Sequence, residues 1–126
     1  MILADTHVLL WAASNSRRLS EKARTIIHEA SERRWFSAAS VWEIAIKRAR
    51  HRNFDVDVEM LRNGLRENGW QELGVTSEHA VAVLELPPIH KDPFDRMLLA
   101  QARVAGLTLL TSDQTVARYP GNVMRV

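Results

Sequence analysis

The stretch Asp92-Pro-Phe-Asp-Arg-Met-Leu-Leu-Ala-Gln-Ala-Arg-Val-Ala-Gly-Leu-Thr-Leu-Leu110 carries the signals for a helix followed by a buried strand. Asp92 is a favourable N-cap and Pro93 a favourable first-turn residue, so a helix is expected to begin here. Gly106 can adopt the left-handed conformation that ends a helix. The apolar run at residues 108–110 predicts a strand. A helix leading into a buried strand is the repeating unit of a parallel α/β sheet.

The same alternation continues through the rest of the chain. Strands are expected over residues 1–4, 34–36, 70–73 and 122–126, and helices over residues 7–13, 20–33, 37–50, 57–68, 76–86 and 112–117. Strands that alternate with helices predict an α/β layered sandwich with a mostly parallel sheet. Ligands of such sheets bind beyond the carboxyl ends of the strands, which is where a functional site is expected.

Composition narrows the class of protein. The chain has 126 residues, of which 46% are hydrophobic and 25% charged, as in an ordinary globular domain. It has no cysteine, which excludes disulfides, cysteine-ligated zinc and iron–sulfur clusters. No apolar run approaches the roughly 20 residues of a membrane helix, and Asp5 interrupts the N-terminal run too early for a signal peptide. We therefore expect one cytoplasmic domain over residues 1–126, with no membrane partner.

Positive charge is distributed unevenly along the chain. The net charge is only +2, yet arginine supplies 14 of the 17 positive residues, with clusters at residues 17–18, 33–34 and 47–52. Guanidinium groups match the geometry of phosphates, whereas cations at helix C-termini are also favourable without any ligand. Both interpretations stay open at this point. The candidates for contact with RNA are Lys47, Arg48, Arg50 and Arg96.

Four acidic residues stand within or at the ends of apolar segments, namely Asp5, Glu43, Asp95 and Asp113. Carboxylates are costly to bury near apolar runs unless something compensates them. The predicted topology allows all four to meet at the carboxyl edge of the sheet. Carboxylates that converge would repel one another, so a cluster would imply a bound cation. Oxygen ligands alone suit a hard divalent ion such as Mg²⁺ or Mn²⁺.

Each acid also has an alternative explanation that needs no ligand. Asp5 could cap the following helix, although Thr6 could serve equally well. Glu43 could pair with Lys47 one turn later, for only about 0.2–0.5 kcal/mol. Asp113 could be a turn or cap residue.

Asp92 and Asp95 lie three residues apart and compete for one role. Asp92 is well explained as the N-cap, and Asp95 could close a capping turn or pair with His90 or Arg96. We favour Asp95 as the site residue and Asp92 as a supporting cap. Hydroxyl groups near the last acid could also support a metal-bound water, and these belong to Thr111 and Ser112.

These segments together resemble the PIN-domain ribonucleases, and in particular the VapC-type toxins of bacterial toxin–antitoxin pairs. The matching segments are residues 3–11, 37–47, 86–102 and 110–113, which follow the order of the family along nearly the whole chain. The resemblance implies a three-layer α/β/α sandwich with a mostly parallel central sheet of about five strands. It also implies that Asp5, Glu43, Asp95 and Asp113 form a quartet that binds Mg²⁺ or Mn²⁺.

The resemblance implies an endoribonuclease that hydrolyses RNA phosphodiester bonds with a metal-activated water. Thr6 and Ser40 match polar positions that support such a site. A homodimer and a small inhibitory antitoxin protein are the implied partners. Packing or hydrogen bonding is the expected role of His7 and His90. The four tryptophans are expected in the core or a dimer interface rather than stacked on bases, and these are Trp11, Trp35, Trp42 and Trp70.

Other classes of protein fit the acidic positions less well. A phospho-receiver domain needs an adjacent acidic pair after its first strand, and a haloacid-dehalogenase-type phosphatase needs Asp-x-Asp there. Neither pattern matches Asp5-Thr-His7. The remaining alternative is a non-catalytic module of the same fold that binds RNA or a protein. An intact quartet argues against that alternative, since a dead copy has no reason to keep uncompensated carboxylates.

Overall fold

A five-stranded sheet runs through the centre of the protein, in a computed structural model that describes residues 1–126. The strand order is β3-β2-β1-β4-β5, and every neighbouring pair is parallel. The strands are β1 (Ile2–Ala4), β2 (Arg34–Ser37), β3 (Gln71–Leu73), β4 (Thr108–Thr111) and β5 (Val123–Arg125). The parallel sheet of about five strands expected from the sequence is therefore confirmed.

The central strand β1 marks the point where the strand order reverses. The chain moves outward from β1 to β2 and β3, and it then returns to the other side of β1 to form β4 and β5. Ligands of open α/β sheets bind beyond the carboxyl ends of the strands at such a reversal. Asp5 follows β1 directly, and Asp113 follows β4 after Ser112. Two of the four acids thus flank the position that this topology favours for a site.

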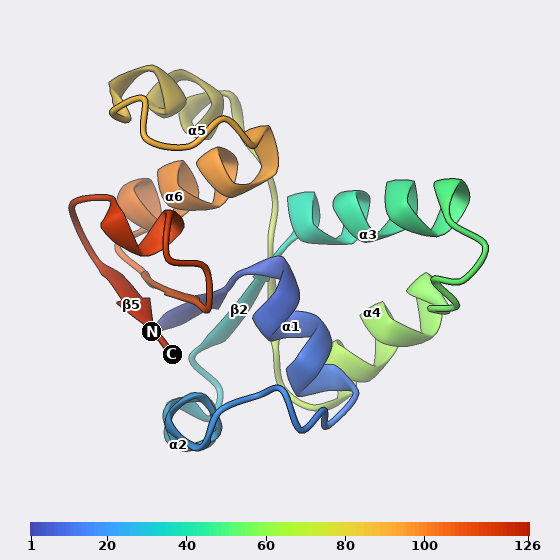
Figure 1. Ribbon diagram of the computed structural model, residues 1–126. Coiled ribbons are helices and arrows are strands. Elements are labelled where there is room, and N and C mark those ends of the chain that lie inside the picture. The colour runs from blue at the N-terminus through green and yellow to red at the C-terminus, as the bar shows by residue number, and fades with distance from the viewer.

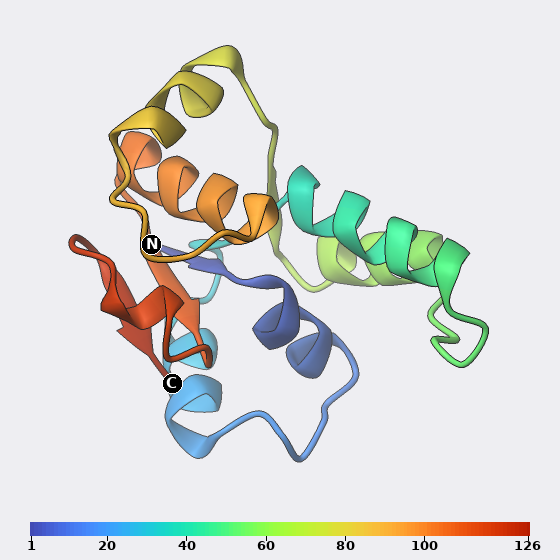
Figure 2. The same cartoon turned by 45° about the horizontal axis from the view of Figure 1, so that its top comes forward.

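Helices cover both faces of the sheet (Figure 1). They are α1 (Thr6–Ala13), α2 (Glu21–Ala30), α3 (Ala38–Arg50), α4 (Val58–Glu67), α5 (Ser77–Ala82) and α6 (Pro93–Ala105), with short 3₁₀ helices η1 (Val83–Glu85) and η2 (Val116–Arg118). Helices α5 and α6 lie on one side, and α1 and α2 on the other. The turned view in Figure 2 shows the same separation. None of these helices is both long and apolar enough to span a bilayer.

Side chains that alternate along the strands build two cores. On β1, Ile2 and Ala4 pack into a cluster with residues of α1, α2 and α4. Leu3 points to the opposite face and packs with Leu98 and Leu99 of α6. Successive strand residues face opposite sides of a sheet, so a strand covered by helices on both faces is apolar throughout. The two cores give the three-layer α/β/α sandwich that the family resemblance implied.

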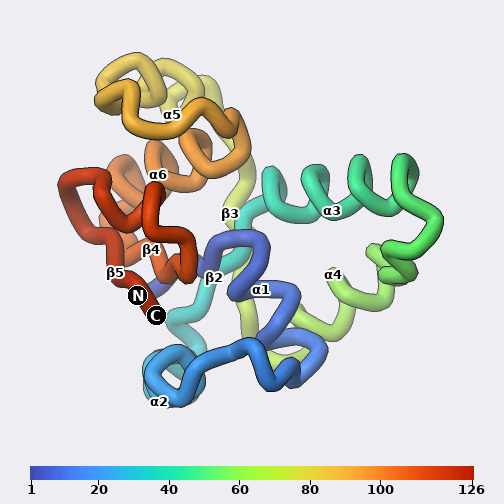
Figure 3. The backbone as a smooth tube through the Cα atoms, in the orientation of Figure 1, coloured from blue at the N-terminus to red at the C-terminus, as the bar shows by residue number.

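Helix α3 extends beyond the sheet, and α4 runs back along α3 (Figure 3). Only part of the apolar surface of α3 is covered, because Ile44 is buried and Val41 half-buried whereas Ala45 is exposed. Trp42 is 63% exposed and does not join the core, so of the two positions expected for the tryptophans only an interface remains for it. The other three tryptophans are buried or packed against a core, and these are Trp11, Trp35 and Trp70.

Two predicted helices differ from the observed elements. The helix expected over residues 20–33 ends at Ala30, because Ser31 takes a positive φ of 51° that stops it. The helix expected over residues 112–117 is replaced by a turn and the short η2. The side chain of Asp113 accepts the amides of Thr115 and Val116 there, which favours a turn over a regular helix.

Candidate active site

Asp5 lies at the junction of β1 and α1 and is only 3% exposed. It is the N-cap of α1, with Oδ1 accepting the Val8 amide at 2.9 Å. Oδ2 accepts the Thr111 hydroxyl of β4 at 2.6 Å. Burial raises the pKa of Asp5 against the lowering effect of these hydrogen bonds. The capping role and the site position proposed from the sequence therefore coincide in one side chain.

Asp95 lies in the first turn of α6, where Asp92 is the cap as predicted. Asp92 Oδ1 accepts the amides of Phe94 at 2.8 Å and of Asp95 at 3.1 Å. Oδ2 of Asp95 lies 2.8 Å from His90 Nε2, so His90 is its hydrogen-bond partner. Burial, with smaller contributions from the negative charges of Asp92 and Asp5, raises the pKa of Asp95 to about 6. The Asp92 carboxylate thus adds charge to the site as well as capping the helix.

Glu43 is held by the hydroxyl group of Thr6 and not by Lys47, the alternative partner considered from the sequence. The Thr6 hydroxyl donates to Glu43 Oε1 at 2.6 Å and lies 3.0 Å from Ser40 Oγ. A hydroxyl has one proton, so Ser40 is left to donate to Thr6. Burial, then the nearby Asp92 and Asp5, raise the pKa of Glu43. The ammonium of Lys47 lies instead 4.6 Å from the ring centre of Phe54.

Asp113 is the most exposed of the four acids. Its amide donates to Thr111 Oγ1 at 3.0 Å, and its Oδ1 accepts the Thr115 amide at 2.7 Å. A ligand atom of Asp113 lies within 4.8 Å of one atom each from Asp95 and His90. Thr111 therefore links Asp5 to Asp113, whereas Ser112 makes no side-chain hydrogen bond.

Asp95 and Asp113 lie together beside His90, whereas Asp5 and Glu43 lie outside that close group and are near enough only for the charges to interact. The negative charge of Asp5 acts on both Glu43 and Asp95, and that of Asp113 acts on Asp5. None of the four forms an ion pair with a lysine or arginine. Three of them keep one carboxylate oxygen without a hydrogen bond from the protein, namely Oε2 of Glu43, Oδ1 of Asp95 and Oδ2 of Asp113. Such free, uncompensated oxygens fit a hard divalent cation.

Arg96 has a structural position that differs from the predicted contact with RNA. Its Nη1 donates to the Pro87 carbonyl at 3.0 Å and to the Tyr119 hydroxyl at 3.1 Å, and its Nη2 donates to the Val83 carbonyl at 3.1 Å. Tyr119 is 4% exposed, and its hydroxyl also accepts the His90 amide at 2.7 Å. The guanidinium thus joins η1 and the following loop to α6. Through Tyr119 it also supports the backbone of His90, the hydrogen-bond partner of Asp95.

Replacing Arg96 with alanine should therefore destabilise the protein. The change leaves carbonyl groups of the loop without their donor, at a cost of about 2–4 kcal/mol. The thermal midpoint should fall by roughly 6–15 °C in a melting experiment. The matched control is Arg103→Ala in the exposed last turn of the same helix, which should change the midpoint little. Equal shifts for the two variants would contradict this role of Arg96.

The other predicted RNA contacts lie along the second half of α3. Lys47, Arg48 and Arg50 are all exposed. Arg48 has only a loose pair with Asp55, at 3.8 Å and largely in solvent, and such pairs contribute little. These cations are accessible to a ligand, and their contact with RNA stays a prediction.

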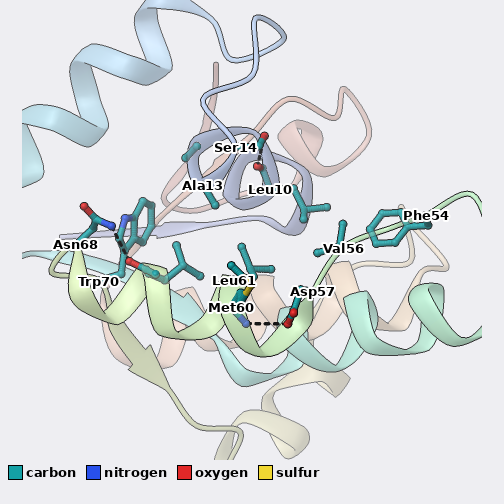
Figure 4. Close-up of a pocket in the computed structure, with 13 residues that line it drawn as sticks. Leu10, Ala13, Ser14, Phe54, Val56, Asp57, Met60, Leu61, Asn68 and Trp70 are labelled. Atoms are coloured by element: carbon teal, nitrogen blue, oxygen red, sulfur yellow. Dashed lines mark hydrogen bonds between the residues drawn. The ribbon is translucent and has the colours of Figure 1, made fainter.

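A large hydrophobic groove lies away from the acids (Figure 4). It is an open groove of about 660 Å³ between α1 and α4, and nine of its 13 lining residues are hydrophobic. Leu10, Leu61 and Trp70 line it, and Met60 is 70% exposed there. None of the four site carboxylates lines this groove, so it is a separate surface.

Two supporting residues were not identified from the sequence. Gln101 is fully buried in α6, accepts the Ser37 hydroxyl at 2.6 Å and donates to the Gly74 carbonyl at 3.3 Å. A lone amide among the apolar residues of α6 was the available signal for it. Tyr119 gives no such signal, because its partners are 23 to 29 residues away in the chain.

Comparisons with known proteins agree with this fold. A toxin–antitoxin complex from Klebsiella pneumoniae matches with a TM-score of 0.71 at 19% identity, covering 98% of this chain and 96% of that chain. A structure of VapBC2 from Rickettsia felis, bound to a DNA fragment from their promoter, matches with a TM-score of 0.72 at 12% identity, covering 100% and 99%. These likenesses establish a shared fold. No curated protein matches the sequence. The family model of the PIN domain matches residues 2–122, and the chain therefore belongs to the PIN-domain family.

Proposed function

We propose that this protein is a Mg²⁺- or Mn²⁺-dependent endoribonuclease and the toxin of a VapC-type toxin–antitoxin pair. The observation that carries the proposal is a group of carboxylates with raised pKa values and no lysine or arginine partner, near the reversal point of the sheet. Membership of the PIN-domain family supports nuclease chemistry. Both structural neighbours described above are toxin–antitoxin proteins, which supports the biological class.

The metal would be held mainly by Asp5, Asp95 and Glu43, with Asp113 completing the site. When bound, a divalent ion supplies charge neutralisation and water activation for phosphodiester hydrolysis. The buried acids leave an excess of negative charge that only a cation would offset. The ligand atoms that lie within 4.8 Å of one another belong to His90, Asp95 and Asp113, so the proposed site would also have to draw in Asp5 and Glu43, which lie outside that group.

The residues around the acids fix the orientation of each carboxylate. Thr111 and the Val8 amide hold the two oxygens of Asp5. Thr6 holds Glu43, and His90 holds Asp95. Groups that are fixed before the substrate binds need no reorganisation during the reaction. These contacts would keep the acids pointed at one place while RNA enters.

The proposed partners are RNA, a small antitoxin and a second copy of the chain. The exposed cations of α3 would contact the phosphates of RNA, with a strong dependence on salt. The groove between α1 and α4 offers the apolar surface that a protein partner such as the antitoxin needs. The homodimer rests on family resemblance.

An RNA cleavage assay tests the proposal and separates it from a non-catalytic binding module. Purified protein should cut a labelled single-stranded RNA in millimolar Mg²⁺ or Mn²⁺, and EDTA should stop the reaction. Renewed addition of the metal should restore it. RNA binding without metal-dependent cleavage in either ion, over a panel of RNA substrates, would favour the non-catalytic module instead.

A further inference from the structure

We propose that Trp42, supported by Phe94, is the platform on which one base of a single-stranded RNA substrate stacks beside the acidic site. This inference rests on the proposed nuclease function and names a substrate-positioning residue for it. Trp42 immediately precedes Glu43 in α3, and Phe94 immediately precedes Asp95 in α6. The two rings contact each other, and each belongs to the residue that precedes a site acid in the chain.

The ring pair is held in a defined geometry. The centroids of Trp42 and Phe94 lie 5.2 Å apart at an interplanar angle of 68°, an edge-to-face contact. The Phe94 amide is bound by Asp92 at 2.8 Å, which anchors the residue that supports the indole. Trp42 nevertheless remains 63% exposed. An edge-to-face contact uses only part of the indole, so a large part of its surface stays open to solvent.

Packing alone does not explain an exposed indole at this position. Most of the other residues of α3 that leave the core are small or charged, as expected for solvent-facing positions. Nucleobases stack on exposed aromatic rings with little dependence on sequence, because every base has a π-face. A base held on Trp42 would bring its strand to the segments of α3 and α6 that carry Glu43 and Asp95.

Charge on the same helix favours RNA over an apolar protein segment as the occupant. Lys47 and Arg50 follow Glu43 by one and two turns of α3, on the same side of the helix. The rise of about 1.5 Å per residue places Lys47 roughly 7.5 Å along the axis from Trp42. A polyanion could therefore stack one base on the indole and meet these cations with its neighbouring phosphates. An apolar segment would gain nothing from them.

Two substitutions at one position test the platform. Trp42→Ala should raise KM for a short single-stranded RNA by roughly 10- to 100-fold, with kcat changed less than about twofold. Trp42→Tyr keeps an aromatic face and should recover most of the loss. Leu84→Ala, which removes a side chain that is 84% exposed on η1, is the matched control for lost apolar surface. Melting curves of all variants report whether the fold is kept.

A modified substrate shows whether the partner of Trp42 is a base. An oligonucleotide series with one abasic position moved along the strand should contain one member that binds wild type as weakly as Trp42→Ala binds the intact strand. The Trp42→Ala variant should bind that same oligonucleotide almost as well as it binds the intact strand. An abasic penalty at every position that is equal for both proteins would overturn the proposal, as would an unchanged KM for Trp42→Ala.

The platform can also be judged if cleavage fails. RNA affinity measured by fluorescence anisotropy, in Mg²⁺ and in EDTA, does not depend on turnover. Absence of cleavage by wild type would reject the nuclease function, whereas weaker RNA binding of Trp42→Ala would still support stacking. Equal or absent RNA binding would overturn the platform. A change in sedimentation mass with unchanged RNA binding would assign Trp42 to a protein interface and also overturn it.

Discussion

Asp5→Asn is expected to reduce RNA cleavage by at least about 100-fold while the fold is retained, a scale typical of removing an electrostatic group from an active site. Asparagine caps helices as well as aspartate does, so the bond from the Val8 amide can persist. The Thr111 hydroxyl can rotate to accept from the new amide. What the substitution removes is the buried negative charge that would bind the cation. Cleavage of labelled RNA and a melting curve, measured on the same preparation, check both halves of the prediction.

The control for this change is Asp57→Asn, the same substitution at another helix cap. Asp57 caps α4 by accepting the Met60 amide at 3.0 Å and is exposed outside the acidic group. It should leave cleavage unchanged. Full metal-dependent activity of Asp5→Asn would remove Asp5 from the proposed site, and an unfolded Asp5→Asn would show that its charge is structural.

Millimolar Mn²⁺ should raise the melting temperature of the protein at pH 7.5 and have much less effect at pH 5. Burial raises the pKa values of Asp5, Glu43 and Asp95 in the folded protein, the last to about 6. Protons therefore compete with the metal for these carboxylates at pH 5, and the competition is weaker at pH 7.5. At a metal concentration of 100 times Kd, binding adds about 2.7 kcal/mol, or roughly 8–13 °C in a domain of this size.

Without metal, the stability of the folded protein should fall as the pH rises, because of the same carboxyl groups. A carboxyl whose folded pKa lies above its unfolded value binds its proton more tightly in the folded state, so its contribution to stability falls as pH rises through the folded pKa. For Asp95 the interval from 3.8 to about 6 corresponds to at most about 3 kcal/mol, lost on raising the pH across that range. Asp95→Asn should remove this loss, so its stability relative to wild type should increase from pH 4 to pH 7.

Melting curves in EDTA and in Mn²⁺, at matched ionic strength and both pH values, measure these effects together. Asp95→Asn should also reduce the Mn²⁺ shift strongly. The absence of any Mn²⁺ shift in wild type at pH 7.5 would argue against a metal site at these acids. A shift equal in wild type and Asp95→Asn would place the metal elsewhere.

Local signals in the sequence were sufficient for most of the secondary structure. Asp92 was expected to cap a helix, and it does so by accepting an amide two residues later. Ser20 and Ser37, the first residues of two expected helices, cap them in the same way. Gly106 ends α6 with a φ of 69°, as expected. These interactions are contained within one turn of the chain, so the residues that make them can be identified before the fold is known.

The candidate site was only partly accessible from the sequence. The positions after the strands indicated which carboxylates could meet, and the family pattern separated Asp95 from Asp92. The contacts that hold them were not foreseeable in detail. Thr111 reaches Asp5 across 106 residues, and Thr6 reaches Glu43 across 37. These hydroxyl groups lie far from the acids in the chain, so the sequence does not indicate which of them become hydrogen-bond partners.

The sequence by itself therefore determined the order of most elements and several of their caps, because capping and hydrophobic periodicity act over a few residues. The four acids were indicated by their positions after strands together with the resemblance to the PIN-domain family. Tertiary structure alone decided that the guanidinium of Arg96 serves the loop carbonyls, that Gln101 joins β2 to the segment after β3, and that Trp42 stays outside the core. The physical reason is that burial and hydrogen-bond partners depend on which elements pack together, and that is settled by the whole chain at once.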